Sequence, residues 1–194
     1  MATHINGESE FRTLPLSERK VLTIRPTLNQ ARISAVSKPT AVFLGCFQGY
    51  SMPIWNETTN VEEELYYRFK VPERWDGISD PIINGYNYIT GVEDVGDTFK
   101  FTFDYNCVDC MNGVLTDSVY SVDDEATIAT GRTAQYTPYC LQASIPAATI
   151  QESGIFAGRV RRVESTGTEV DNEVAVIYIS IEFPVDKIYA PWDY

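Results

Sequence analysis

The sequence predicts an all-β fold, a jelly-roll sandwich or barrel of about eight to ten antiparallel strands with short terminal arms. Runs of β-branched and aromatic residues recur along the 194 residues, with a turn signal roughly every 10–15 residues. Inside the best of these runs, apolar residues alternate with polar ones at the period of two that is typical of a strand. Convincing helical periodicity and internal repeats are both absent from the sequence.

The clearest strand covers residues 97–105, where aromatic side chains fall on one face and polar ones on the other. The two sets are Phe99, Phe101, Phe103 and Tyr105, and Lys100, Thr102 and Asp104. Further strands are expected at residues 20–25, 41–47, 63–71, 82–89, 155–163 and 173–183, with weaker ones near 113–120, 126–130 and 136–143. Residues 147–154 fit a single helical turn closed by Gly154.

The last strand, residues 173–183, is expected to be covered on both sides for much of its length, because both of its faces are apolar. One face would carry Ala175, Ile177, Ile179, Ile181 and Phe183, and the other Val174, Val176 and Tyr178. Pro184 is expected to end this strand.

A chain of this length fits one domain, and we expect residues 20–183 to be that single jelly-roll β domain. Residues 1–19 are polar and without period, which indicates an N-terminal arm. Residues 184–194 end in a short aromatic run and are predicted to form a C-terminal tail.

The net charge of −12 speaks against nucleic-acid binding through a basic patch. The nearest approach to such a patch is Arg159, Arg161 and Arg162, which we interpret as a solvated strand face, with contact to an acidic neighbour as the alternative. No apolar run is long enough to span a membrane. The sequence also begins without a signal-peptide pattern, so production in the cytoplasm is expected.

We expect no catalytic residue, no cofactor and no metal site, and therefore no enzyme. The single histidine, His4, lies in the predicted arm, whereas nucleophilic catalysis needs a histidine on a rigid scaffold. The glycine-rich loop that cradles phosphates is also absent.

The four cysteines include one CxxC pair, Cys107 and Cys110, with Cys46 and Cys140 far away in the sequence. Reduced thiols are the default expectation for a chain without a signal peptide. Two alternatives stay open: one or two disulfides, either Cys107–Cys110 or a long-range pair involving Cys46 and Cys140, and a zinc site that uses Cys107 and Cys110.

Carboxylates gather in predicted loops, and we interpret them as solvated turns of an acidic protein, with a calcium site as the alternative. They are Asp94, Asp97, Asp117, Asp123, Asp124, Glu125, Glu169, Asp171 and Glu173. The aromatic residues Trp55, Trp75, Tyr86, Tyr88 and Trp192 are expected to pack strand ends or subunit contacts. A sugar-stacking platform is the alternative for these five residues.

The segment from Phe69 to Pro81 is the most distinctive stretch, in which a strand ends at a proline, an aspartate-rich turn follows and a new strand begins. With the closing strands around residues 159–163 and 176–181, this order resembles the small single-jelly-roll structural and capsid proteins of bacterial and archaeal viruses. That family has a strand ending in I-P-x-x-W/M-D, followed by a P-x-x-K-x-x-W strand. Residues 84–88 depart from the pattern, because they lack its lysine and tryptophan.

The resemblance spans roughly residues 41–183 and implies a virion structural protein, either a capsid or a capsid-decoration subunit, that acts by homo-oligomeric packing. On this interpretation its partners are other copies of itself and other virion proteins, and it resides in the virion after assembly in the host cytoplasm. Two alternatives are a carbohydrate- or receptor-binding β-sandwich module, whose partner would be a glycan, and a β-sandwich glycoside hydrolase. The hydrolase would need two carboxylates facing each other across a cleft.

Overall fold

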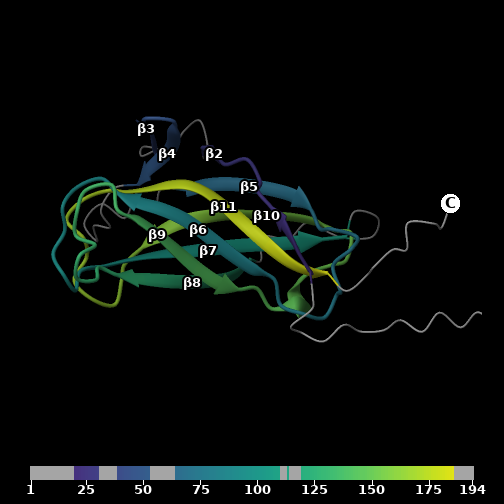
Figure 1. The fold of residues 1–194 in the computed structure, drawn as a ribbon. Coiled ribbons are helices and arrows are strands. Elements are labelled where there is room, and N and C mark those ends of the chain that lie inside the picture. The colour runs from purple at the N-terminus through teal and green to yellow at the C-terminus, as the bar shows by residue number, and fades with distance from the viewer. Residues whose placement is uncertain (1–19, 31–38, 53–63, 110–112, 114–118, 186–194) are drawn as a thin grey trace, which may run out of the picture.

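The computed structural model describes residues 20–30, 39–52, 64–109, 113 and 119–185, which form two antiparallel β-sheets packed face to face (Figure 1). The strands are β1 (Lys20–Ile24), β2 (Asn29–Gln30), β3 (Thr40–Leu44), β4 (Phe47–Met52), β5 (Glu64–Lys70), β6 (Ile82–Ile89), β7 (Thr98–Val108), β8 (Tyr120–Thr127), β9 (Pro138–Ser144), β10 (Ile155–Val163) and β11 (Val174–Val185). The short 3₁₀ helix η2 (Ala147–Thr149) lies between β9 and β10. Within these described ranges, no helix is long and apolar enough to cross a membrane.

The strand order is that of a jelly roll, which confirms the predicted fold class. The first sheet runs β3-β4-β11-β6-β9, with β1 paired to the far end of β11, and the second runs β2-β5-β10-β7-β8. Strands β4, β11, β6 and β9 thus face β5, β10, β7 and β8, the pairing that two interlocked Greek keys produce. The proposed arm, residues 1–19, and residues 186–194 of the proposed tail lie outside the described residues.

In the core between the sheets, aromatic rings of β5, β7 and β10 pack against aliphatic side chains of β6 and β11. The alternation predicted for β7 is confirmed, because Phe99, Phe101, Phe103 and Tyr105 are all buried. Tyr105 stacks on Phe156 of β10 with ring centroids 5.1 Å apart. Burying these apolar side chains stabilises the sandwich by roughly 25 cal/mol for each Å² of apolar surface removed from water.

The single strand predicted at residues 41–47 is a hairpin instead, formed by β3 and β4. Gly45 and Cys46 make the two-residue loop, with Gly45 at φ +57°. A glycine in the left-handed region at the first central position is what a type II′ hairpin turn requires. The sequence did not reveal this turn, because a glycine within an apolar run is equally compatible with a continuous buried strand.

The weak strand predicted at residues 126–130 lies earlier in the chain, as β8 (Tyr120–Thr127), while residues 114–118 of the one predicted at 113–120 lie outside the described residues. The centre of β8, Asp123, Asp124 and Glu125, was interpreted as solvated turn. Asp123 forms an ion pair with Lys100 of β7, and Asp124 accepts a hydrogen bond from the backbone N–H of Gln142 of β9 (2.7 Å). Cross-strand partners therefore hold this acidic segment in an edge strand.

The two faces predicted for β11 are wrong, because a β-bulge between Val176 and Tyr178 exchanges inward and outward positions partway along the strand. Before it, Val174 and Val176 point into the core. After it, the inward residues are Ile179 and Ile181, while Tyr178 points outward. Strand β11 also runs through Pro184 to Val185, because its last residues pair with β1 rather than with β6, and that pairing tolerates a proline.

Candidate functional site

The outer face of the first sheet carries a row of aromatic side chains from neighbouring strands. Tyr178 of β11 lies directly opposite Tyr86 of β6, and their rings stack with centroids 4.2 Å apart and planes 23° apart. The guanidinium of Arg25, just beyond β1, lies over the Tyr178 ring at 5.4 Å from its centroid. The Tyr86 and Tyr178 rings contact each other by their faces, and the Arg25 guanidinium lies over the Tyr178 ring. The three side chains are thus layered across the strands.

Beside this stack runs a row of short polar side chains on the same face. The Gln142 side-chain amide of β9 donates to the Asn84 Oδ1 of β6 at 2.6 Å, and the Asn84 amide reaches the Ser180 Oγ of β11 at 3.5 Å. Asn84 and Ser180 are buried, whereas Gln142 is exposed. Amide and hydroxyl groups therefore follow the tyrosine stack across three strands.

Tyr88 and Tyr136 continue the aromatic row toward one end of the sheet. Their rings meet edge to face with centroids 5.9 Å apart. Tyr136 has φ +65°, in the left-handed region that bulky residues rarely adopt. Its backbone N–H donates to the Ile89 carbonyl at 2.8 Å, which fixes this conformation, and its ring stays 45% exposed. Strained backbone of this kind is found most often at sites with a function.

Two tyrosine hydroxyls of this face, those of Tyr86 and Tyr88, are protonated at neutral pH. Burial raises the pKa of Tyr86 above its ordinary value, and the hydrogen bond with Ser180 offsets only part of that rise. Burial also raises the pKa of Tyr88. Both hydroxyls can therefore donate as well as accept hydrogen bonds. Charged groups near this face include Arg25 over the Tyr178 ring, Glu182, and Asp124, which accepts the Gln142 backbone N–H.

Of the five aromatic residues proposed from the sequence, the structure brings two together on this face, Tyr86 and Tyr88. Trp75 is buried instead: its indole N–H donates to the Ser79 carbonyl at 3.0 Å and its ring packs against Phe183. Trp55 and Trp192 lie outside the described residues. Sequence reasoning missed Tyr136, Tyr178, Asn84, Gln142 and Arg25. The alternation in β6 already placed Asn84 beside Tyr86, but no local signal connected β6 with β9 and β11.

The three arginines of β10 contact acidic neighbours, so the interpretation as a solvated face is wrong. Arg159 and Arg161 each donate through Nε to the Asp104 carboxylate at 2.7 Å, and Arg159 also pairs with Glu64 at 2.6 Å. These side chains lie on the outer face of the second sheet. Arg162 points to the opposite side of β10, because side chains alternate along a strand.

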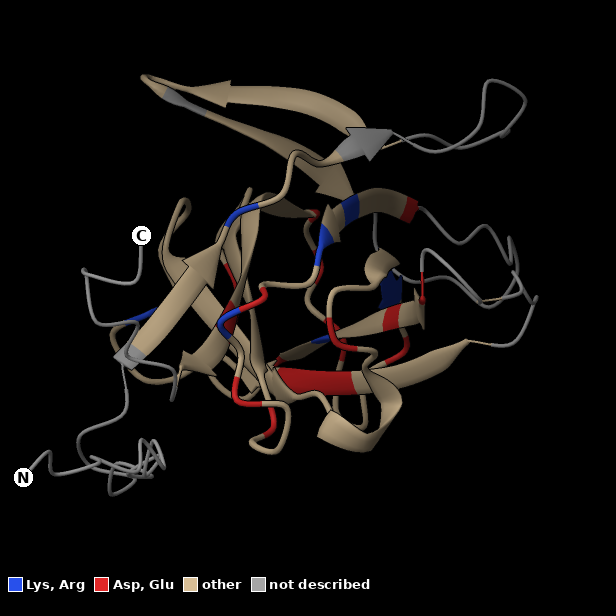
Figure 2. Ribbon diagram, turned by 90° about the vertical axis from the view of Figure 1, so that its right-hand side faces the viewer, with Lys and Arg blue, Asp and Glu red and all other residues tan. Residues whose placement is uncertain are grey.

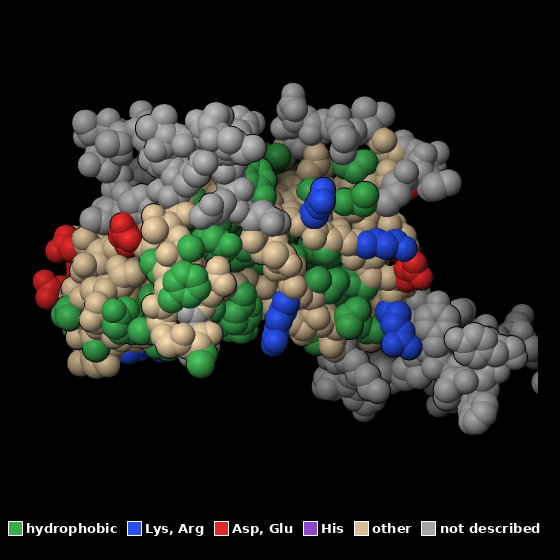
Figure 3. All heavy atoms as spheres, turned by 90° about the horizontal axis from the view of Figure 1, so that it is seen from above, with side chains coloured by type: hydrophobic (Ala, Val, Ile, Leu, Met, Phe, Trp, Pro, Cys, Tyr) green, Lys and Arg blue, Asp and Glu red, His purple; other side chains and the backbone are tan. Residues whose placement is uncertain are grey.

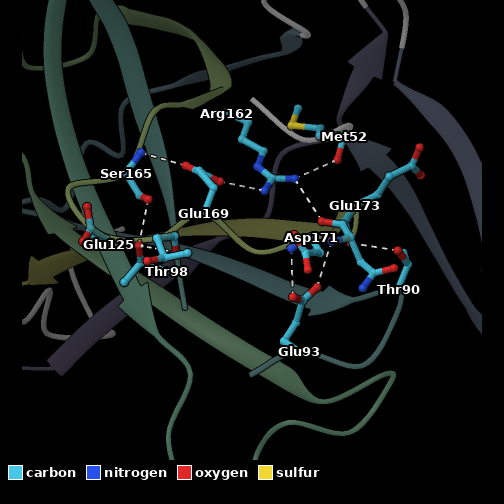
Figure 4. A network of polar contacts seen from close by, with 12 residues as sticks. Met52, Thr90, Glu93, Thr98, Glu125, Arg162, Ser165, Glu169, Asp171 and Glu173 are labelled. Carbon is cyan, nitrogen blue, oxygen red and sulfur yellow. Dashed lines mark hydrogen bonds and ion pairs between the residues drawn. The ribbon is translucent and has the colours of Figure 1, made fainter. Parts of the chain in front are cut away.

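Arg162 belongs to a polar network at one end of the sandwich (Figure 4). Its guanidinium donates to the Glu169 carboxylate at 3.0 Å and to the backbone carbonyls of Met52 (3.3 Å) and Asn172 (3.4 Å). Glu169 in turn accepts the backbone N–H of Ser165 at 2.7 Å. The network links β4 and β10 to the loop before β11, which is a structural role.

The loop carboxylates are also used within the structure. Glu93 accepts the backbone N–H groups of Asp171 and Asn172, each at 2.9 Å, and Glu125 accepts the N–H and hydroxyl of Thr166, each at 2.7 Å. Across the described ranges, no three His, Cys, Asp or Glu side chains come together as metal ligands. Asp117, one of the acidic loop residues, lies outside those ranges. Nothing in these contacts supports the glycoside hydrolase alternative, which requires two carboxylates facing a substrate.

Of the CxxC pair, Cys107 is described and Cys110 lies outside the described residues. Cys107 points into the core side of β7, where its sulfur accepts the backbone N–H of Gln151 at 3.3 Å. Cys46, at the hairpin tip, and Cys140, next to Tyr86, are exposed free thiols. The long-range disulfide between Cys46 and Cys140 is therefore not formed.

No family model matches the chain, and no curated protein matches its sequence. Among solved structures, it is similar to a family 28 carbohydrate-binding module specific for non-crystalline cellulose, with 10% identity, a TM-score of 0.36 and coverage of 76% of this chain and 79% of that one. It is also similar to the family 11 carbohydrate-binding module of Clostridium thermocellum, solved with a β-1,3-1,4-mixed-linked tetrasaccharide. That likeness has 8% identity, a TM-score of 0.36 and coverage of 89% and 93%.

These structures are carbohydrate-binding modules and not viral capsid proteins, so the prediction of a capsid or capsid-decoration subunit is corrected. A TM-score of 0.36 is too low to transfer a ligand or a binding face to this chain. The function proposed next therefore depends on the side chains of the protein itself.

Proposed function

We propose that this domain binds carbohydrate through the outer face of its first sheet. The observation that carries the proposal is the Tyr86–Tyr178 stack lying beside the polar row of Gln142, Asn84 and Ser180. A sugar presents C–H faces that favour aromatic contact and hydroxyls that require directed donors and acceptors. On this face the tyrosine rings provide the aromatic contact and the exposed Gln142 amide provides polar groups, while the buried Asn84 and Ser180 hold Gln142 and Tyr86 in position.

The geometry also indicates how a glycan would contact the face. The faces of the Tyr86 and Tyr178 rings cover one another, and Arg25 lies over Tyr178, so the stack offers ring edges and hydroxyls outward. The exposed ring of Tyr136 is the better candidate for stacking on a sugar. Tyrosine gives a rigid contact at low cost in conformational entropy, because only two side-chain torsions have to be fixed.

The charge at the face favours a neutral glycan. Arg25, Glu182 and Asp124 lie near the face, and the whole chain carries a net charge of −12. A polyanionic polysaccharide would meet long-range repulsion from such a protein. We therefore expect neutral glycans to bind better than uronic-acid polymers of similar length.

Affinity electrophoresis through gels containing neutral glucans, mannans, xylans or polyuronates tests the proposal, with titration calorimetry on any ligand found. Tyr86→Ala, Tyr136→Ala and Gln142→Ala should each weaken binding by about fivefold to fiftyfold, the loss of one ring contact or hydrogen bond. Tyr66→Ala, on the outer face of the second sheet, is the matched control and should bind like the parent protein. No retardation in any gel, or equal binding by all four variants, would contradict the proposal.

A further inference from the structure

The β3–β4 hairpin projects from the sandwich, and one edge of it has no neighbouring strand among the described residues. In two perpendicular views it stands apart from the body of the domain (Figures 1 and 2). Among the described strands, β3 pairs with β4 alone. Its other edge therefore presents backbone N–H and C=O groups that a further strand could pair with.

The hairpin is also uncharged, in contrast to the rest of the chain. No Asp, Glu, Lys or Arg occurs from Thr40 to Met52, and Figure 2 shows the hairpin without a basic or acidic residue. Natural edge strands are usually protected by charges, proline or a bulge. Strand β3 has none of these and exposes the Phe43 ring at 73%.

Seen from the side on which the hairpin lies, hydrophobic side chains gather across the middle of the molecule (Figure 3). Acidic side chains lie at both ends of this view, and basic ones gather toward its right-hand side. A protein with a net charge of −12 repels its own copies over most of its surface. An uncharged projecting hairpin is a place where two copies can meet without that repulsion.

The turn determines which backbone groups point to the free edge. In a hairpin with a two-residue loop, the residues flanking the loop, Leu44 and Phe47, form a hydrogen-bonded pair. Hydrogen-bonded pairs then alternate along the strands, so Val42 faces β4. The N–H and C=O groups of Ala41 and Phe43 consequently point outward, away from β4.

The sequence of β3 is self-complementary in the antiparallel direction about Val42. Pairing with a second copy sets Val42 opposite Val42, Ala41 opposite Phe43, and Thr40 opposite Leu44. Each small residue then lies against a larger one, and no charge lies opposite a like charge. Ala41 and Phe43 of the two copies would exchange about four backbone hydrogen bonds.

We propose that β3 is a dimerisation edge, along which two copies of this chain pair through antiparallel β3 strands about a two-fold axis at Val42. The pairing joins the first sheets of the two copies into one continuous sheet. A two-fold axis is the commonest symmetry of homo-oligomers, and it requires the self-complementary register that β3 has. The contact is short, so we expect a dimer that dissociates in the micromolar range.

Sedimentation velocity of the full chain from about 1 to 300 μM tests this proposal. The parent protein should shift from monomer to dimer. Phe43→Lys, which places a charge on the edge, should raise the dissociation constant at least about tenfold. Gln48→Lys is the matched control, because Gln48 lies opposite Phe43 on the inner strand, away from the edge. It should change dimerisation less than about threefold, and circular dichroism should show that both variants are folded.

The register is tested separately by disulfide trapping in a chain with Cys46→Ser and Cys140→Ser. Val42→Cys places two thiols opposite each other at the axis and should give a cross-linked dimer on mild oxidation. Thr40→Cys should not, because its two copies would lie roughly 13 Å apart along the strands. Cross-linking by both variants or by neither would overturn the register.

Three other outcomes would overturn pairing along the β3 edge. A monomer at all concentrations with slow amide exchange at Ala41 and Phe43 would mean that another part of the same chain covers β3. A monomer with fast exchange at both amides would leave the edge unpaired. An oligomer that Phe43→Lys and Gln48→Lys weaken equally would assign the contact to the hairpin face rather than to its edge.

Discussion

Replacing Asp104 with asparagine should lower the free energy of unfolding by about 2–3 kcal/mol at pH 7. The carboxylate is 1% exposed and accepts hydrogen bonds from Arg159 and Arg161, each at 2.7 Å, and from Ser121 at 2.5 Å. Asparagine keeps the shape and one acceptor but removes the charge that both guanidinium groups face. The loss should lie below the roughly 3–5 kcal/mol of a fully buried pair, because both arginines are partly exposed and Arg159 retains Glu64.

The pH dependence identifies the charge as the cause. Burial alone would raise the pKa of Asp104, but hydrogen bonds from Arg161, Ser121 and Arg159 outweigh it, and the pKa lies below its ordinary value. A carboxyl with a lowered folded-state pKa contributes its full stability above the unfolded value of about 3.9. It loses that stability as pH falls through the folded value. The difference between parent and Asp104→Asn should therefore shrink as pH falls below about 4.

Urea unfolding between pH 3 and 7, followed by tryptophan fluorescence, measures both effects without adding salt. In thermal unfolding at pH 7, the same loss corresponds to about 4–12 °C for a domain of this size. Asp123→Asn is the matched control, since Asp123 is a half-exposed ion-pair partner of Lys100 on the same sheet face, and should cost less than about 1 kcal/mol. A loss at Asp104 below about 0.5 kcal/mol, or one that persists unchanged at pH 3, would refute the reasoning.

Three further changes probe other parts of the fold. Arg162→Lys should cost about 2 kcal/mol in urea unfolding, because one ammonium cannot reach Glu169 and both carbonyls together; unchanged stability would contradict this. Gly45→Ala should cost about 1 kcal/mol and Gly45→Asn less, since asparagine tolerates the left-handed region better; equal losses would argue against the turn. Cys140 should react with a disulfide reagent more slowly than Cys46 in the native protein, because burial and nearby carboxylates raise the pKa of its thiol. The two rates should converge in urea, and equal native rates would count against the effect.

Local pattern was sufficient where one physical cause acted within a single strand. The bounds of β6 and β10 agree with residues 82–89 and 155–163, because apolar runs between turn signals leave little choice of conformation. The alternation of β7 correctly identified its buried aromatic face. Local pattern was insufficient where a glycine turn interrupted an apolar run at Gly45, and where the bulge after Val176 exchanged the two faces of β11.

The sequence also predicted only part of the candidate binding face. Tyr86 and Tyr88 were proposed from the sequence as part of an aromatic platform, and their spacing of two placed them on one face of a strand. Trp75, proposed with them, is a core residue, because the loop after β5 turns its ring onto Phe183. A tryptophan in a loop gives no local indication of whether it faces the core or the solvent.

The sequence by itself determined the all-β class, the position of most strands and the inward face of β7, because period-two alternation, proline and glycine act over a few residues. Only the tertiary structure decided that Asn84, Gln142 and Ser180 lie in one row beside the stack of Tyr86 and Tyr178. These residues come from β6, β9 and β11, whose adjacency depends on the jelly-roll strand order and on a register shifted by one bulge. Long-range pairing of this kind is set by how both sheets close over a common core, which no short stretch of sequence encodes.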